Sequence, residues 1–359
     1  MNGGKKMMAK GKEKMVNGNG AFEVCQAEYW ERTPGGAVAC RLCPHGCTLA
    51  DGQRGLCRSR VNSGGQLVSE AYGRVCALAV DPVEKKPLLH FHPGGRCLSL
   101  AAAGCNLACP GCQNHSISQA LPGDVPSRRL APADVARLAR EAGCRMVAYT
   151  YTEPLTWLEY TRDCARACRE RGLANILVTA GYVEAAPLAA LLPYVDAANV
   201  DLKSFSADIY AHCCRAALAP VLRTLTMMRD AGVWVEVTNL VIPGVTDNLG
   251  DIERMCRWLA SEGFADSPLH FSRFFPSYRM TGVPPTPTET LVSARDIARR
   301  CGINYVYIGN VSLPGAEDTR CPRCGTVLIR RSGYSVSTAS FGGRCHVCGQ
   351  EIAGRFGPL

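Results

Sequence analysis

The chain has 359 residues, of which 47% are hydrophobic, so it can bury a large core in one domain with appendages or in two domains. No uninterrupted apolar run approaches the ~18 residues of a membrane span, and the N-terminus lacks an apolar signal segment, so we expect a cytoplasmic protein without membrane contact. The formal net charge is +9, but much of the excess lies in residues 1–24, which we expect to be a disordered basic tail. The remainder is only mildly basic, which disfavours a nucleic-acid binder.

Cysteine is the most informative residue type in this chain. Eleven of the 21 cysteines fall into three tight groups with metal-ligand spacing, and no secretory signal accompanies them. We therefore expect thiols in a reducing compartment rather than disulfides. The other ten lie mostly in apolar or helical surroundings and are expected to be inert, and the adjacent Cys213 and Cys214 receive no role.

The first group lies in the segment CRLCPHGCTLADGQRGLCRSR, which is rich in Gly and in turn residues. Its four members, spaced Cys-x2-Cys-x3-Cys-x9-Cys, are Cys40, Cys43, Cys47 and Cys57. Four thiolates close a site around either a structural zinc ion or an auxiliary 4Fe-4S cluster. Spacing alone leaves both open, and we slightly favour the cluster. Residues 65–95 then read as short strands and turns.

The second group lies in residues 100–119, LAAAGCNLACPGCQNHSISQ, directly after a strand-like run. Cys105, Cys109 and Cys112 have the spacing Cys-x3-Cys-x2-Cys, which suits a 4Fe-4S cluster held on a Gly-rich loop. Three ligands leave the fourth iron open for the amino and carboxylate groups of S-adenosylmethionine, which one electron can cleave to a 5'-deoxyadenosyl radical. A closed zinc site needs a fourth ligand that this loop lacks.

Strand and helix patterns alternate from Arg96 to Val311. Apolar, β-branched runs occupy residues 145–151, 174–181, 197–204, 233–244, 268–276 and 304–311. Helical stretches occupy residues 155–172, 185–194, 221–232, 252–263 and 290–302. The alternation predicts a parallel sheet in an α/β fold, a partial or complete (β/α) barrel whose site lies at the carboxyl ends of the strands. The cluster loop follows the first strand and therefore belongs to that end.

Polar residues follow the predicted strands. Glu153 comes after the second strand, and an ordinary helix N-terminal acid that favours the dipole is the competing interpretation for it. Asp201 and Lys203 alternate with Leu202 on the fourth strand and therefore share one face. A structural ion pair is the competing interpretation for these two residues.

The third group consists of two Cys-x2-Cys-Gly knuckles near the C-terminus. Its members are Cys321, Cys324, Cys345 and Cys348. Such knuckles close a tetrahedral zinc ribbon, and a module this small needs the metal in order to fold. A rubredoxin-like iron is the alternative. We thus divide the chain into residues 1–24, a four-cysteine segment over 25–95, a barrel over 96–313 and a zinc-ribbon-like module over 314–359.

The cluster loop resembles the signature of radical SAM enzymes, and CNLxCxxCQN is similar to the branch of pyruvate formate-lyase activating enzyme. The order CxLCPxxC, DPxEKKPL, CNLxCxxCQN, YTYTEP, DLK, VEVTNLVIPG, PLHFSRFFP and YxGNV, followed by the four-cysteine ribbon, resembles the AmmeMemoRadiSam system radical SAM enzyme family over residues 40–356. Gly111, Ala180 and Phe275 depart from the family pattern, where an aromatic residue, Asn and His are expected.

The resemblance implies specific ligands for the cofactor. Glu153 would hold the methionine amino group, Lys203 the carboxylate, and Asp201 with Thr179 a nearby cation. It also implies reductive cleavage of S-adenosylmethionine, an electron donor of flavodoxin or ferredoxin type, and Memo-like and AMMECR-like partners. We expect hydrogen abstraction from a protein or a partner-delivered substrate; modification of a free small molecule and an electron-transfer or redox-sensing protein are the alternatives.

Overall fold

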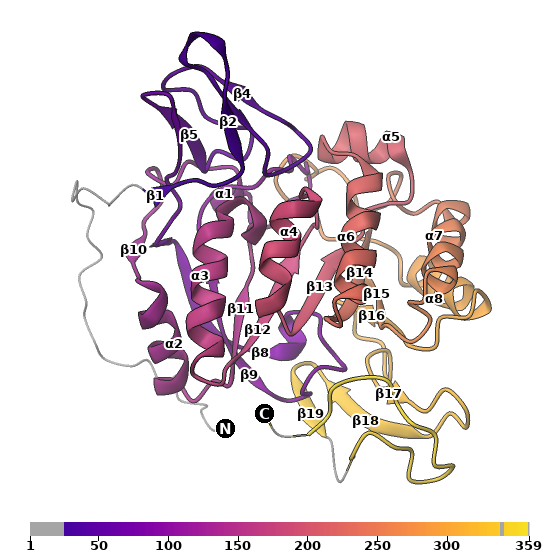
Figure 1. The fold of residues 1–359 in the computed structure, drawn as a ribbon. Helices are drawn as coiled ribbons and strands as arrows, with labels where there is room; N and C mark the ends of the chain where they lie inside the picture. The colour runs from indigo at the N-terminus through magenta and orange to yellow at the C-terminus, as the bar shows by residue number, and fades with distance from the viewer. Residues whose placement is uncertain (1–24, 338–340, 358) are drawn as a thin grey trace, which may run out of the picture.

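The computed structural model describes residues 25–337, 341–357 and 359, and the expected basic tail lies outside them. Its centre is an eight-stranded sheet with helices packed along its outer face (Figure 1). In the order of pairing, the strands are β16 (Val306–Gly309), β15 (Leu269–Arg273), β14 (Trp234–Val241), β13 (Ala197–Asp201), β12 (Ala174–Thr179), β11 (Met146–Tyr149), β9 (Arg96–Ala101) and β8 (Ala77–Pro82). Neighbours from β9 to β16 are parallel, which confirms the predicted parallel α/β sheet.

The sheet is a partial barrel rather than a complete one. Among the described residues, the edge strands β8 and β16 do not pair with each other. Strand β8 joins the sheet antiparallel to β9, with Asp81 opposite Cys97. The sheet therefore begins with β8, whereas the sequence patterns placed the start of the barrel at residue 96. Strand β8 pairs antiparallel with β9, and a repeat of parallel strands and helices does not include such a strand.

Helices connect the parallel strands and cover the outer face of the sheet (Figure 1). They are α2 (Pro132–Glu141), α3 (Leu158–Arg169), α4 (Ala185–Leu191), α6 (Leu218–Asp230), α7 (Leu249–Ser261) and α8 (Thr288–Arg300). Helix α7 shows why they form: the Asn248 side chain accepts from the Asp251 amide at the N-cap, and the apolar stripe from Ile252 to Leu259 is buried. Within the described residues, none of the helices has the length and apolarity that crossing a bilayer requires.

A separate apolar cluster fills one end of the barrel interior. Val83, Leu88 and Phe91 come from the segment after β8, and they pack against Met146 and Ala197 at the starts of β11 and β13. Alternate strand residues such as Val147 face the helices instead and belong to the larger core. The cluster plugs the amino ends of the strands, so a ligand has access at their carboxyl ends.

Small three-stranded sheets lie at opposite ends of the barrel (Figure 1). At the carboxyl ends lie β1 (Cys25–Gln26), β2 (Trp30–Arg32), β3 (Val38–Cys40), β4 (Thr48–Leu49), β5 (Arg60–Ser63) and β6 (Gln66–Ser69), which we call the N-terminal module. At the other end lie β17 (Thr319–Arg320), β18 (Val327–Ser332) and β19 (Ser335–Ser337), which we call the C-terminal ribbon. The remaining short elements are β7 (Arg74–Val75), β10 (Arg128–Arg129), α1 (His115–Ser118) and α5 (Ala207–Ile209).

Candidate functional site

The cluster loop leaves the carboxyl end of β9, as the sequence predicts, and carries Cys105, Cys109 and Cys112, all half-buried. Its backbone is fixed before the first cysteine, because Gly104 has a φ of +103° and a Cβ there would lie 2.5 Å from the Cys57 carbonyl oxygen. Just after that cysteine, the Asn106 amide donates to the Tyr182 carbonyl at 2.7 Å. The loop is therefore held on both flanks of Cys105.

Gly111, where the resemblance implies an aromatic residue, lies against other apolar side chains. A Cβ at this position would lie 3.1 Å from the Phe274 ring and 3.2 Å from the Met280 sulfur. Phe274 follows β15, so an aromatic ring already stands beside the third cysteine, contributed by a distant segment. A larger residue at position 111 would have to displace both side chains.

Glu153 is fully buried at the end of β11, and three donors fix its carboxylate. Oε1 accepts from the Thr179 hydroxyl at 2.6 Å and the Leu155 amide at 3.1 Å, and Oε2 accepts from the Ala180 amide at 2.8 Å. Burial raises the pKa of Glu153, and these hydrogen bonds oppose the shift. The Glu153 side chain caps the short helix Pro154–Trp157. Its carboxylate also lies near the cluster loop, since the burial of Cys105 and the charge of Glu153 both raise the pKa of Cys105.

Thr179 lies at the end of β12 and orients Glu153. Its hydroxyl donates to the carboxylate of Glu153 and accepts from the Gly181 amide at 2.9 Å. A hydroxyl used in this way fixes the direction of the carboxylate. The structure thus brings Thr179 to Glu153, whereas the resemblance associates it with a cation near Asp201.

Asp201 and Lys203 share one face at the end of β13, as the alternation predicts. Their side chains form an ion pair at 2.7 Å and are 31% and 25% exposed. Burial would lower the pKa of Lys203, but the charges of Asp201 and Cys109 raise it above its usual range. A hydrogen bond from Cys214 and the charge of Lys203 in turn lower the pKa of Cys109. The ammonium group therefore lies beside the cluster loop.

Sequence analysis did not single out Asp81 and Lys86, which contact Tyr151, two residues before Glu153. The Tyr151 hydroxyl donates to Asp81, Lys86 bonds to Asp81 at 2.8 Å, and its ammonium lies 4.4 Å from the centre of the Tyr151 ring. Tyr151 has a φ of +67°, a left-handed conformation that costs a bulky residue roughly 1–2 kcal/mol. The string DPVEKK, with its charges beside a strand, was the available signal.

Residues 100–259 match the sequence profile of the Radical SAM superfamily. An uncharacterized protein of Methanocaldococcus jannaschii is 43% identical over 330 residues, covering 91% of this chain and 98% of that protein. The chain belongs to the radical SAM superfamily. It is 25% identical over 180 residues to the benzylsuccinate synthase activating enzyme of Thauera aromatica (46% of this chain, 54% of that one) and 24% identical over 167 residues to the pyruvate formate-lyase 1-activating enzyme of Escherichia coli (43% and 68%).

Membership in the radical SAM superfamily makes the chain an enzyme that uses a 4Fe-4S cluster and S-adenosylmethionine. The residues fit these groups, since three thiols lie on one loop with a carboxylate and an ammonium beside it. A fully buried carboxylate suits an amino group, and an ammonium suits a carboxylate. We therefore assign Cys105, Cys109 and Cys112 to the cluster as an inference from this donor set.

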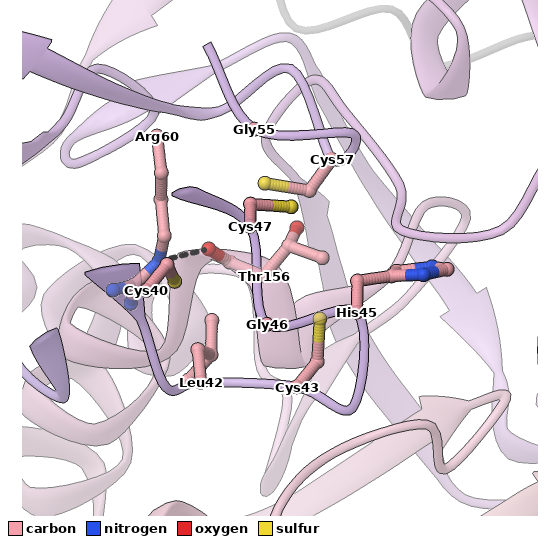
Figure 2. A pocket seen from close by; sticks show the side chains of 10 residues that line it. All are labelled: Cys40, Leu42, Cys43, His45, Gly46, Cys47, Gly55, Cys57, Arg60 and Thr156. Carbon is pink, nitrogen blue, oxygen red and sulfur yellow. Dashed lines mark hydrogen bonds between the residues drawn. The ribbon is translucent and has the colours of Figure 1, made fainter. Parts of the chain in front are cut away.

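The radical SAM enzyme carries its other two cysteine groups in different geometries. The sulfurs of Cys321, Cys324, Cys345 and Cys348 all lie within 4.8 Å of one another. With Zn–S bonds of about 2.3 Å, the four ligands of one zinc ion lie roughly 4 Å apart, so this group fits zinc. Cys40, Cys43, Cys47 and Cys57 instead line a common pocket in the N-terminal module (Figure 2).

Proposed function

We propose that the enzyme reductively cleaves S-adenosylmethionine and uses the resulting radical to abstract hydrogen from a protein or from a substrate delivered by a partner protein. The observation that carries the cleavage step is the convergence of three loop cysteines, Glu153 and Lys203 at the carboxyl ends of β9, β11 and β13. When bound, the cluster supplies one electron to the sulfonium. The protein's own residues hold and orient the nucleotide.

Charge complementarity assigns the two charged side chains. Glu153 accepts a hydrogen bond from the methionine amino group, because about one acceptor site of its carboxylate stays free after three hydrogen bonds and Thr179 fixes its direction. Lys203 binds the methionine carboxylate, and Asp201 holds the ammonium in position until the ligand arrives. The ring of Phe274, close to the third cysteine, supplies an apolar wall.

Replacing either charged residue is expected to weaken S-adenosylmethionine binding without removing the cluster. Charge-assisted hydrogen bonds are worth about 1.5–3 kcal/mol, which corresponds to a roughly tenfold to hundredfold loss of affinity for Glu153→Gln or Lys203→Met. Equilibrium titration with the nucleotide, alongside an iron count, measures both properties. The matched control is Glu141→Gln, which changes an exposed carboxylate on α2. Affinity unchanged in both site variants would show that the pocket lies elsewhere.

Two observations support a large substrate. The curated relatives include enzymes named for activating pyruvate formate-lyase and benzylsuccinate synthase. Small modules cover both ends of the partial barrel, and the sheet stays open between β8 and β16 within the described chain. The resemblance to the AmmeMemoRadiSam system family supports Memo-like and AMMECR-like proteins as partners, and a flavodoxin or ferredoxin as electron donor.

Isolated enzyme with reductant is therefore expected to cleave S-adenosylmethionine slowly, without transferring hydrogen to a product. Addition of the Memo-like and AMMECR-like partners should accelerate formation of 5'-deoxyadenosine or label one partner, as measured by mass spectrometry with partners produced in deuterated medium. The control is the same mixture with the Cys105→Ala variant. Efficient deuterium transfer from a small labelled metabolite, with no partner present, would contradict this assignment and favour a free small-molecule substrate.

A further inference from the structure

The N-terminal module contains a small pocket that four cysteines share (Figure 2). The four are Cys40, Cys43, Cys47 and Cys57, and Figure 2 shows their side chains around one space. Gly55, which has no side chain, faces two of these sulfurs. A Cβ at Gly55 would lie 3.6 Å from the Cys57 sulfur and 3.8 Å from the Cys47 sulfur. The four thiols thus form one candidate ligand set.

The arrangement of these sulfurs differs from that of the sulfurs in the C-terminal ribbon. In the C-terminal ribbon all four sulfurs come within 4.8 Å of one another, as ligands of a single ion must. Among the described residues, no three sulfurs of the N-terminal pocket approach so closely, and the same holds for Cys105, Cys109 and Cys112. Ligands of a 4Fe-4S cluster bind separate corners of a cube and therefore lie farther apart. The cysteines of the N-terminal pocket are thus not arranged closely around a single ion, as those of the ribbon are.

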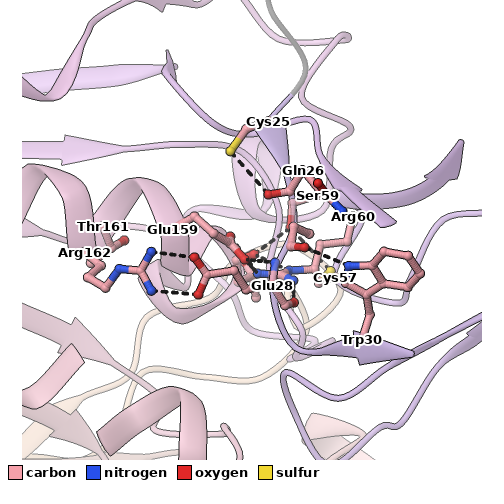
Figure 3. Close-up of polar contacts among 12 residues, drawn as sticks. Cys25, Gln26, Glu28, Trp30, Cys57, Ser59, Arg60, Glu159, Thr161 and Arg162 are labelled. Atoms are coloured by element: carbon pink, nitrogen blue, oxygen red, sulfur yellow. Dashed lines mark hydrogen bonds and ion pairs between the residues drawn. The ribbon is translucent and has the colours of Figure 1, made fainter. Parts of the chain in front are cut away.

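A buried cation stands beside this pocket (Figure 3). The Arg60 side chain is 1% exposed, and its guanidinium donates to both Glu159 oxygens at 2.6 and 2.7 Å. It also donates to the Glu28 carbonyl at 2.9 Å, so its position is fixed. Arg60 lines the same pocket as the four cysteines. Because Glu159 neutralises this cation, the ion pair adds no net charge to the pocket and instead fixes one of its walls.

The pocket and the cluster loop share a wall. The His45 ring bonds to the Asn106 carbonyl at 2.7 Å, and Asn106 follows Cys105 directly. The Cys57 carbonyl oxygen lies against Gly104, on the other side of Cys105. His45, which lines the pocket, and Cys57, one of its four cysteines, therefore contact the two sequence neighbours of Cys105.

We propose that Cys40, Cys43, Cys47 and Cys57 hold an auxiliary 4Fe-4S cluster that passes electrons to the cluster at Cys105, Cys109 and Cys112. A reduced flavodoxin or ferredoxin gives one electron to the auxiliary cluster. That electron then moves to the cluster at Cys105, Cys109 and Cys112, which we call the second cluster. The auxiliary cluster returns to its oxidised state as the second cluster is reduced. No atom or proton moves between the two sites. The relay rests on the proposed function, whereas the presence of the auxiliary cluster does not.

Metal analysis of a variant without Cys105, Cys109 and Cys112 tests whether the N-terminal pocket holds the auxiliary cluster. The full-length Cys105→Ala, Cys109→Ala, Cys112→Ala variant, reconstituted anaerobically with iron and sulfide, should retain a 4Fe-4S cluster detectable by Mössbauer spectroscopy. Adding Cys43→Ala and Cys47→Ala should remove it, whereas adding Cys144→Ala and Cys256→Ala, at buried cysteines of the barrel, should not. Zinc or no metal in the N-terminal pocket of the triple variant would overturn the proposal, whatever the activity of the native enzyme.

Spectroscopy tests the relay without reference to activity. With both clusters reduced, the native protein should give an electron paramagnetic resonance spectrum broadened by spin coupling. The sum of the spectra from single-cluster variants should lack this broadening. After rapid mixing with reduced flavodoxin, reduction of the second cluster should be at least tenfold slower when Cys43 and Cys47 are replaced. Additive spectra, or equal rates of reduction, would overturn the relay and leave the auxiliary cluster structural.

Discussion

Replacement of Cys105, Cys109 and Cys112 with Ala is expected to abolish cleavage of S-adenosylmethionine, leaving 5'-deoxyadenosine at the level of an enzyme-free control. The three thiols are the ligands available on the loop after β9, and without the cluster no electron reaches the sulfonium. The change should leave the fold intact, because these cysteines are half-buried at the loop surface and the barrel core is formed by other residues. Anaerobic assays with dithionite, read by chromatography, measure the loss.

The matched control for this variant replaces three cysteines outside the metal-spaced groups. Cys76, Cys144 and Cys301 are free thiols in the barrel region, and their replacement with Ala should retain cleavage. Cleavage that persisted in the loop variant would disprove the assignment of the cluster. An intact cluster in the native enzyme without any cleavage would instead favour the electron-transfer or redox-sensing alternative.

The sequence predicted the parts of the fold that depend on local pattern. Apolar runs became β11 to β16 because each is buried between helices on one side and the barrel interior on the other. Glu153, Asp201 and Lys203 could be found because they follow strands whose carboxyl ends must meet at one edge of a parallel sheet. The order of strands along the chain was sufficient to predict that these three residues lie at the same edge of the sheet.

Contacts between segments that are distant in the chain could not be predicted in the same way. Asp81 reaches Tyr151 through the antiparallel pairing of β8 with β9, which a βα repeat does not specify. Cys214 is a second example. It ends the π-helix Tyr210–Cys214, and its carbonyl accepts a hydrogen bond from the Ala108 amide of the cluster loop at 3.0 Å. The sequence around Cys214 contains no metal-ligand pattern that would have predicted this contact. Such positions depend on tertiary packing, which single-sequence periodicity does not encode.

His90 shows the same limit at the opposite end of the barrel. It is fully buried, and its ring bonds to the Ala353 carbonyl at 2.7 Å and the Tyr307 hydroxyl at 2.5 Å. Burial lowers the pKa of His90 to about 4, so it is neutral at physiological pH. This histidine joins the barrel to the C-terminal ribbon. Its partners lie more than 200 residues away in the chain, so local sequence patterns do not predict the contact.

The ribbon and the barrel share one small apolar cluster. Leu89, Tyr305 and Tyr307 from the barrel region pack with Leu328, Ile329 and Ile352 from the ribbon. The Arg331 guanidinium adds a hydrogen bond to the Leu89 carbonyl at 2.6 Å. Because so few apolar residues lie within the ribbon itself, we expect its fold to depend on this shared surface and on a metal ion of the kind that its four cysteines fit.

Removal of zinc from the full-length protein is therefore expected to unfold the C-terminal ribbon while the barrel stays folded. Zinc binding to small four-ligand modules contributes on the order of 10 kcal/mol at neutral pH, which is comparable with the whole stability of a typical domain, roughly 5–15 kcal/mol. Hydrogen exchange after chelation should show loss of protection in β18 and β19 and retention in β12 and β13. Cys345→Ala should reproduce this pattern without chelator, whereas Cys301→Ala, on the barrel, should not. Protected β18 amides in protein shown to be zinc-free would mean that the ribbon folds on barrel contacts alone.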